Sequence, residues 1–516
     1  QDLSKHMLVV GTTGSGKTTT CLNLLAELAS HGIPFLVIEP VNAEHDDYRS
    51  LLRLPDLADR LQVFTLGDEE TAPFRLNPFE IQRGITVNEH ISSMLTAFKA
   101  AIPMWEPLPR LFLKALVRTY YRKGWTAFKK PQGLVTEPVF PTMQDFYREL
   151  SRVIDTEVEH EGEVKGNIRG ASKLRIEALL EGSCGRILTA RRSLALETWM
   201  ERPTILELKH IGDDEDKALM IAFILMSINE YLEKGRKRDD KDRLQHVTLI
   251  EEAHRLLGKT DPGTSPEQSN TKGQAAEAFA RALAENRKYG EGIIIAEQLP
   301  TKLVTDAIGN TGLKVMHRLT SADDREELGR AMKFNEFQQE FVTAMRAGQA
   351  AIYGLDIEEP TLIQASDYWS DWESKGFPVQ SAPVTDGELR DLMLGKYPSN
   401  EFLPHTGCEL CPAPCQVRDH GESLLYDKSL DLLGKFVALC SELSPEDSSQ
   451  MTAGQLVDFC YQAVNLHSSE QIVGVRRKAV DFCLFVFLKE ASGLFGDHDP
   501  LLWESYFRTY QDEFSV

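Results

Sequence analysis

The chain has 516 residues, enough for two or three domains, and its hydrophobic and charged fractions of 42% and 26% are ordinary for a globular protein with a sizeable core. The formal net charge of −21 argues against nonspecific coating of nucleic acid, although it leaves room for a local basic channel. No run approaches the ~18 apolar residues of a membrane span. Eight cysteines in so long a chain and no visible signal peptide favour a reducing, cytoplasmic location.

The first predicted element is a phosphate-binding loop. Residues 11–18 fit G-x-x-x-x-G-K-[ST], between an apolar strand at residues 7–10 and the first turns of a helix from residue 19. The glycines let backbone N–H groups converge on phosphate oxygens at a helix N-terminus. Lys17 is predicted to reach the β- and γ-phosphates, and the Thr18 hydroxyl to bind Mg²⁺. The predicted nucleotide-binding residues are Gly11, Thr12, Thr13, Gly14, Ser15, Gly16, Lys17, Thr18 and Thr19.

Two more buried strands are predicted at residues 33–38 and 61–66. The first ends in acids, and Glu39 or Glu44 could position Mg²⁺ or water, although a helix-capping or solvated acid is equally expected. The sequence begins only one strand before the phosphate loop, so we expect an upstream domain outside it.

Residues 86–200 have apolar residues at helical spacing and are predicted to form a helical insertion. A small basic cluster in this stretch is predicted either to contact nucleic acid or, as is more common, to form a solvated helix face. It consists of Lys165, Arg169, Lys173 and Arg175.

A short strand at residues 204–208 and a long helix at 217–232 precede the second strong signal. The apolar strand 247–250 ends in Glu251-Glu252, which is the Walker B pattern with Glu in place of the usual Asp. Glu251 is predicted to hold Mg²⁺ through water, and Glu252 to polarise the attacking water as general base.

Residues 258–275 are polar and rich in Gly and Pro, and are predicted to form a long loop before a helix at residues 275–289. The next buried strand, residues 292–296, is followed by Glu297 and Gln298. Gln298 can sense the γ-phosphate or orient water, or it can be simply a polar strand terminus. Strands at residues 313–319 and 350–353 complete the predicted sheet.

Several of these segments, in this order and at these intervals, resemble the HerA-like ATPases of the FtsK–HerA superfamily of P-loop NTPases. The resemblance covers roughly residues 1–370 and includes Lys5 to Lys17, Ile250 to His254, Arg287 to Gly290, Glu297 to Pro300 and Arg318 to Arg325.

The resemblance implies a RecA-like ATP- and Mg²⁺-dependent core that assembles into a homo-oligomeric ring, expected to be a hexamer, and moves double-stranded DNA through its pore. It also implies a nuclease or other effector partner, in DNA end processing or antiphage defence. ATP would lie between subunits, and an arginine from the neighbour, Arg287 or Arg318, would complete the site. Glu at positions 251 and 39 and the missing N-terminal β-barrel depart from the family pattern.

The C-terminal part contains a compact cluster of potential metal ligands. Cys408, Cys411 and Cys415, with His420 or His405, could form a structural Cys₃His zinc site. Three free cysteines on a Pro-rich loop, or an iron–sulfur cluster with a ligand from elsewhere, are the alternatives. From residue 424 onward the pattern predicts a helical bundle whose aromatic residues form its core or a docking surface for a partner.

The predicted fold class is α/β, with the RecA-like core in residues 1–84 and 201–370 and the helical insertion in residues 85–200. A linker at 371–400 and the C-terminal metal-loop and helical region at 401–516 follow. The predicted function is an ATP-driven DNA translocase or helicase. A nucleotide-dependent scaffold that activates an effector, or a conjugation or secretion ATPase, is the alternative.

Overall fold

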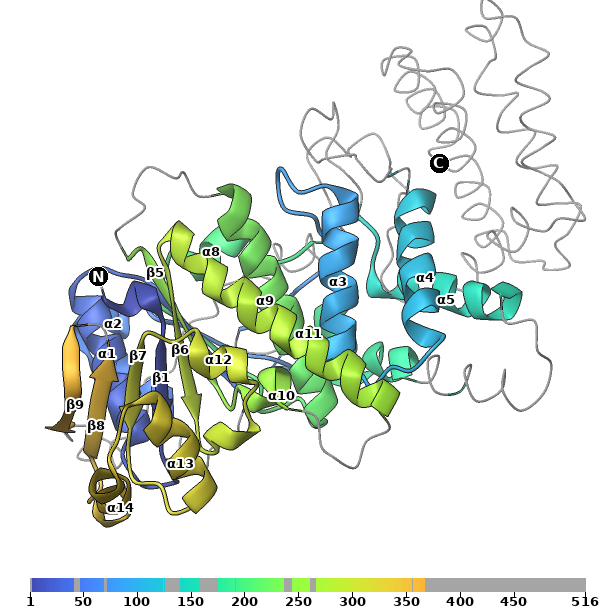
Figure 1. The fold of residues 1–516 in the computed structure, drawn as a ribbon. Helices are drawn as coiled ribbons and strands as arrows, with labels where there is room; N and C mark the ends of the chain where they lie inside the picture. Colours follow the sequence, from blue (N-terminus) through green and yellow to red (C-terminus); the bar gives the residue numbers. More distant parts are fainter. Residues whose placement is uncertain are drawn as a thin grey trace, which may run out of the picture.

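The computed structural model describes residues 2–40, 47–68, 72–123, 140–157, 175–190, 192–235, 244–259, 266–354 and 356–366, together with residues 125 and 170. The described chain is built on a nine-stranded sheet of order β3-β4-β2-β5-β6-β1-β7-β8-β9 (Figure 1). The pairings from β3 across to β7 are parallel, and β8 and β9 add an antiparallel edge. The strands are β1 (Met7–Val10), β2 (Phe35–Glu39), β3 (Gln62–Thr65), β4 (Thr204–Glu207), β5 (His246–Glu251), β6 (Glu291–Glu297), β7 (Leu313–Met316), β8 (Gln349–Gly354) and β9 (Ile357–Gln364).

The central strands are buried on both faces, which explains why they read as continuous apolar runs in the sequence. Successive residues enter two different hydrophobic clusters: Leu8 and Val10 face one side, and Met7 and Val9 face the other. Because side chains alternate along a strand, each of these strands stabilises the packing of both helical layers.

Helices cover both faces of the sheet (Figure 1). The smaller cluster packs the sheet against α1, the 3₁₀ helix η2 (Asp47–Arg53) and α2. The larger cluster packs the opposite face against a helical layer that includes α3, α9, α10 and α11. The α-helices are α1 (Lys17–Ser30), α2 (Pro55–Ala58), α3 (Val87–Ala101), α4 (Leu108–Arg122), α5 (Met143–Glu157), α7 (Gly182–Leu188), α8 (Leu196–Met200), α9 (Asp214–Gly235), α10 (His254–Leu257), α11 (Pro266–Glu285), α12 (Thr305–Gly309), α13 (Ala322–Ala331) and α14 (Glu336–Ala344).

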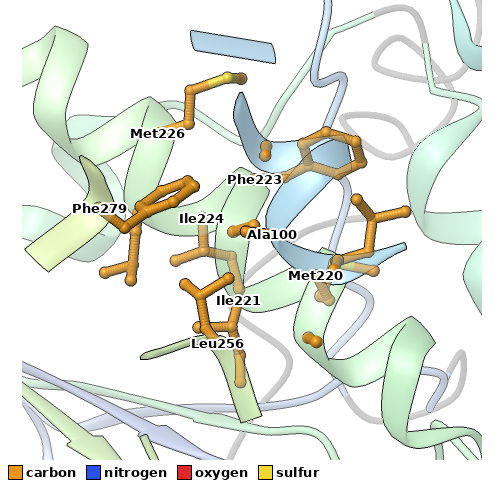
Figure 2. Close-up of a cluster of buried hydrophobic side chains, with 14 of the residues drawn as sticks. Ala100, Met220, Ile221, Phe223, Ile224, Met226, Leu256 and Phe279 are labelled. Carbon is orange, nitrogen blue, oxygen red and sulfur yellow. The ribbon is translucent and has the colours of Figure 1, made fainter. Parts of the chain in front are cut away.

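Helix α9 is the centre of the larger layer. Its residues 218–226 are all apolar and at most 3% exposed, so the helix is enclosed on every side. Figure 2 shows Ile221, Phe223 and Ile224 of α9 among side chains from α3, α10 and α11. Within the described residues, no helix combines the length and the apolar character needed to cross a membrane.

The structure corrects one predicted loop and adds one strand. Residues 266–275, predicted to be loop, form the first turns of α11, which begins at Pro266. Strand β9, which pairs with β8 at the sheet edge, was not predicted. Of the basic cluster, Lys165, Arg169 and Lys173 lie outside the described residues, whereas Arg175 forms an ion pair with Glu215. The C-terminal region from residue 367 also lies outside them.

Candidate nucleotide-binding and hydrolysis site

The phosphate loop lies where β1 gives way to α1, at the carboxyl edge of the parallel strands, which is the usual ligand position in such sheets. Gly14 and Gly16 have φ angles of 71° and 102°, a left-handed conformation that favours glycine. Gly16 is also the N-cap of α1, and no side chain caps this helix end. The first-turn N–H groups, at Lys17, Thr18 and Thr19, therefore face the loop, as an anion site requires.

The loop rests on β7 and β8 and their flanking residues. The backbone N–H and the hydroxyl of Thr12 donate to the carbonyl oxygen of Arg318 at 3.0 and 3.1 Å. The Gly348 N–H donates to the Ser15 carbonyl at 2.8 Å. A Cβ atom on Gly16 would lie 2.7 Å from the Gly348 nitrogen, so the two backbones approach as closely as glycine permits.

His317 lies beneath the loop and is fully buried. Its Nδ1 is 3.0 Å from the Gln349 carbonyl, so Nδ1–H donates there, and Nε2 accepts from the Thr20 hydroxyl at 3.0 Å. Burial lowers the pKa of His317 to about 4, which keeps the ring neutral at neutral pH, and the Gln349 carbonyl, which can only accept, fixes the tautomer.

The polar groups of the loop fit a phosphate chain. Within the described residues, the buried Ser15 hydroxyl has no hydrogen-bond partner, and the buried Lys17 ammonium forms no ion pair. A Cβ atom on Gly11 would lie 2.4 Å from the Ser15 hydroxyl oxygen, so only glycine leaves room for this side chain. An unpaired buried cation and hydroxyl are costly unless a ligand engages them, and phosphate oxygens suit both.

The first Walker B acid, Glu251, ends β5 and is buried close to Lys17. The hydroxyl of fully buried Tyr48 donates to its Oε1 at 2.7 Å. Burial raises the pKa of the Glu251 carboxyl, and the nearby Lys17 ammonium and the Tyr48 hydrogen bond oppose that shift. A bound cation would favour the charged carboxylate further, so Glu251 and the Thr18 hydroxyl are suitable Mg²⁺ ligands.

The second acid, Glu252, has a φ angle of 49°, an uncommon conformation for a residue with a side chain and one that marks functional sites. Its Oε1 accepts from the Gln298 amide at 2.9 Å, and the Gln298 carbonyl oxygen accepts from the Thr13 hydroxyl at 3.2 Å. Gln298 therefore links the predicted general base to the phosphate loop, as a residue that senses the nucleotide would.

Behind this pair, Glu297 ends β6 and is fully buried. Its carboxylate accepts from both the backbone N–H and the ring Nδ1 of His254, and from two backbone N–H groups at residues 298 and 299. Burial opposes ionisation, but these hydrogen bonds outweigh it and lower the pKa of Glu297. The His254 Nδ1 also lies 3.6 Å from Oε2 of Glu252.

The two candidate arginines lie in different places. Arg287 precedes β6, at the opposite end of the strand from Gln298, and β6 spans about 20 Å. Its exposed side chain therefore lies far from the phosphate loop of its own chain. Arg318 follows β7 and contacts that loop through its backbone. Within the described residues, neither guanidinium forms a hydrogen bond or an ion pair.

Sequence reasoning assigned no role to Tyr48, His254, Glu297 or His317. Glu297 directly precedes the predicted catalytic residue Gln298, and His254 lies two positions after Glu252, so closeness in sequence to a predicted residue could have indicated both. Tyr48 reaches Glu251 across 203 residues, which no local pattern can indicate.

Glu39 is buried at the end of β2, beside Glu207 of β4. Glu44 and the predicted zinc ligands Cys408, Cys411, Cys415 and His420 lie outside the described residues, as does the alternative ligand His405.

Comparisons with known proteins agree with this geometry. Residues 1–228 match the family model described as helicase HerA, central domain. The chain is 21% identical over 369 residues to the DNA double-strand break repair helicase HerA of Sulfolobus acidocaldarius, a match covering 71% of this chain and 66% of that protein. It is 22% identical over 393 residues to the probable DNA double-strand break repair helicase HerA of Methanocaldococcus jannaschii, covering 71% and 72%. The chain thus spans about two thirds of the length of these relatives.

The fold has a solved counterpart in VirB4 of Thermoanaerobacter pseudethanolicus. That structure superposes with a TM-score of 0.52 at 17% identity, over 71% of this chain and 91% of VirB4. At this identity the likeness concerns the fold alone. It agrees with a mostly parallel α/β sheet that carries a phosphate loop at its carboxyl edge. Together, the sheet, the site and the family match show that the chain resembles the HerA-like ATPases of the FtsK–HerA superfamily of P-loop NTPases, with residues 1–228 carrying the match to the HerA central domain.

Proposed function

We propose that this chain is the subunit of a ring, expected to be a homohexamer, that hydrolyses ATP to translocate double-stranded DNA. The observation that carries hydrolysis is the continuous contact from Thr13 of the phosphate loop through Gln298 to Glu252. The DNA substrate is proposed because the curated relatives are described as DNA double-strand break repair helicases. A nuclease or other effector partner, in DNA processing or antiphage defence, belongs to the same proposal.

The residues of the site divide the work of hydrolysis. The Lys17 ammonium and the N–H groups at the start of α1 bind and orient the phosphates. Glu252 accepts a proton from the attacking water, and Gln298 holds that carboxylate at a fixed position relative to the phosphate loop. Thr18 and Glu251 would hold Mg²⁺, which supplies positive charge to the phosphate oxygens when bound.

In a ring, a neighbouring subunit can supply the arginine that phosphoryl transfer requires. Phosphoryl transfer is accelerated when an arginine neutralises the developing charge. Arg287, at the far end of β6, lies too distant to serve its own site but is exposed for a neighbouring subunit. Arg318 is the second candidate, and its backbone contact with the loop places it next to its own site.

The test is ATP hydrolysis by the wild type and by Glu252→Gln, with and without linear duplex DNA, at low and moderate salt. We expect DNA to stimulate the wild type, and Glu252→Gln to lose about 100-fold or more of the rate because the base is gone. Salt is varied because binding to the DNA backbone weakens steeply as salt rises. Nucleotide affinity, measured with a fluorescent ATP analogue, should be retained in Glu252→Gln and confirms that the variant is folded.

Hydrolysis that DNA does not change at either salt concentration would contradict a free-standing translocase. That result would favour a nucleotide-dependent scaffold, for which ATP-dependent binding of an effector without DNA stimulation is the positive sign. The net charge of −21 is the observation that keeps this alternative in view, since DNA contact must then be confined to a small part of the surface. A conjugation or secretion ATPase is the remaining alternative, and transport of a substrate across a membrane would be its sign.

A further inference from the structure

We infer that Glu297 is a positioning residue for hydrolysis: its buried carboxylate holds both groups that contact the general base Glu252, namely Gln298 and His254. This inference rests on the proposed ATPase function and concerns the same site. The Glu297 carboxylate accepts hydrogen bonds from His254, Gln298 and Leu299, and these donors include neither Glu252 nor a residue of the phosphate loop.

The carboxylate of Glu297 is fully occupied by N–H donors. Oε1 accepts from the backbone N–H groups of Gln298 at 2.6 Å and Leu299 at 3.2 Å. Oε2 accepts from the backbone N–H of His254 at 3.1 Å and from its ring Nδ1 at 2.8 Å. Four donors on a buried carboxylate make a rigid anchor, because each hydrogen bond to a charged acceptor is strong and shielded from water.

The two anchored residues contact opposite oxygens of Glu252. The Gln298 amide donates to Oε1 at 2.9 Å. The His254 ring lies 3.6 Å from Oε2, and its Nδ1–H is already directed to Glu297. Glu252 is therefore held between two side chains whose positions both depend on Glu297.

The backbone of Glu297 extends the same anchor to the phosphate loop. Its carbonyl oxygen accepts from the Gly11 N–H at 3.2 Å, and Glu297 pairs in register with Val10 of β1. One residue thus fixes the start of the phosphate loop, the nucleotide-sensing glutamine and the surroundings of the base. Catalytic groups must be held within fractions of an ångström of the productive geometry, and such supporting contacts supply that precision.

A cation is the competing explanation for this cluster. Oxygen and nitrogen atoms of Glu252, His254 and Glu297 lie within 4.8 Å of one another, close enough to share a metal ion. Both Glu297 oxygens already accept two hydrogen bonds, however, and the His254 Nδ1 is engaged as a donor. The geometry therefore points to a hydrogen-bonded support rather than a metal centre.

The same strand offers a matched control. Glu291, the first residue of β6, is also fully buried and accepts from a histidine, His246, at 2.8 Å. It additionally accepts from the Thr248 hydroxyl at 2.7 Å. This pair has the same chemistry as Glu297 with His254, but it lies at the opposite edge of the sheet from the phosphate loop. Replacing Glu291 measures what the loss of a buried Glu–His pair does to the fold alone.

The experiment compares kcat and KM for ATP in the wild type, Glu297→Gln, Glu291→Gln, Glu252→Gln and the double variant Glu252→Gln with Glu297→Gln. We expect Glu297→Gln to lower kcat about 10- to 100-fold, the range seen when a residue that orients a functional group is replaced. KM should stay close to the wild-type value because Lys17 and the start of α1 are untouched. Glu291→Gln should keep its kcat. Glu297→Gln should have no further effect in the Glu252→Gln background, since it acts through that base.

His254 provides a second route if Glu297→Gln does not fold. Its side chain is 22% exposed, so replacement is tolerated better than at Glu297. We expect His254→Ala to lower kcat with little change in KM, and His254→Gln to recover part of the loss because its amide can still donate to Glu297.

The outcomes separate this inference from the proposed function. Wild-type kcat in Glu297→Gln and His254→Ala, together with an inactive Glu252→Gln, overturns the positioning role and leaves the base assignment intact. An equal further loss in the double variant also overturns it, since Glu297 would then act independently of Glu252. Wild-type hydrolysis by Glu252→Gln overturns the base assignment and this inference together.

Discussion

At the scale of single residues, His317 shows how burial beneath the phosphate loop makes the fold sensitive to acid. Its pKa falls from 6.5 to about 4 in the folded chain because the ring is buried, so the unfolded chain binds a proton first as pH falls. The stability that the neutral ring contributes is complete above pH 6.5 and is lost as pH falls from 6.5 towards 4. The interval corresponds to about 3 kcal/mol of the free energy of unfolding.

We therefore expect His317→Gln to reduce the loss of stability between pH 7 and pH 4.5, as measured by urea denaturation of the nucleotide-free protein. His31→Gln is the control for the same replacement at an exposed position, because the His31 side chain is 65% exposed. An identical pH dependence in His317→Gln and the wild type would show that His317 is not the group responsible.

The residues predicted from the sequence are those whose chemistry is fixed by a local pattern. The structure brings Lys17, Glu251, Glu252 and Gln298 to one edge of the sheet, because the carboxyl ends of parallel strands all lie at the same edge. Their catalytic roles remain predictions. The supporting residues were not predicted, because the hydrogen bond from Tyr48 to Glu251 and that from Thr20 to His317 join positions about 200 to 300 residues apart.

At the scale of elements, the close approach of β8 to the phosphate loop predicts a difference between two glycines. Gly16 and Gly32 both have positive φ, at 102° and 69°. Alanine at either position should cost about 1–2 kcal/mol of stability, because a side chain disfavours this conformation. Only at Gly16 would the new Cβ meet another backbone, that of Gly348, whereas the space at Gly32 is open.

We expect Gly16→Ala to lose ATP binding and Gly32→Ala to retain it, with the larger loss of thermal stability at Gly16 because its Cβ meets the Gly348 backbone. Binding is measured by titration with a fluorescent ATP analogue, and stability by thermal unfolding. Equal affinity in the two variants would mean that the contact with Gly348 does not shape the loop.

The elements that prediction missed have physical reasons. Strand β9 carries Glu358, Glu359 and Pro360, residues that disfavour a central strand but suit an exposed sheet edge. The early start of α11 was obscured by its polar composition, although Pro266 at the first helical position is a recognised start signal. The helical stretch between β3 and β4 followed from the spacing of its apolar residues.

At the scale of the whole molecule, the positions of Arg287 and Arg318 lead to a mixing experiment. If Arg287 acts on a neighbour, Arg287→Ala and Glu252→Gln should each be inactive alone but should recover hydrolysis when mixed. In a mixed ring, some sites combine an intact base with an intact arginine from the next subunit. Hydrolysis is measured across a range of mixing ratios at constant total protein.

The same mixture made with Arg318→Ala sorts the two candidates. An arginine that serves its own site cannot be complemented by a Glu252→Gln neighbour, so recovery with one variant and not with the other identifies the trans residue. If neither mixture recovers activity although both variants bind nucleotide and assemble, the arginine of a neighbouring subunit is not one of these two.

The order of the strands in the sheet has a consequence for how the protein is made. β1, the first strand of the sheet in the chain, is enclosed by β6 and β7, whose residues follow it by about 280 to 310 positions. At ordinary rates of synthesis, of order 5–20 residues per second, β1 waits tens of seconds on the ribosome for both neighbours. Such long-range pairing is also slow to form. The nascent chain thus carries a complete phosphate-loop sequence long before it carries a phosphate site, and it acquires the capacity to bind nucleotide only after β6 and β7 have been made.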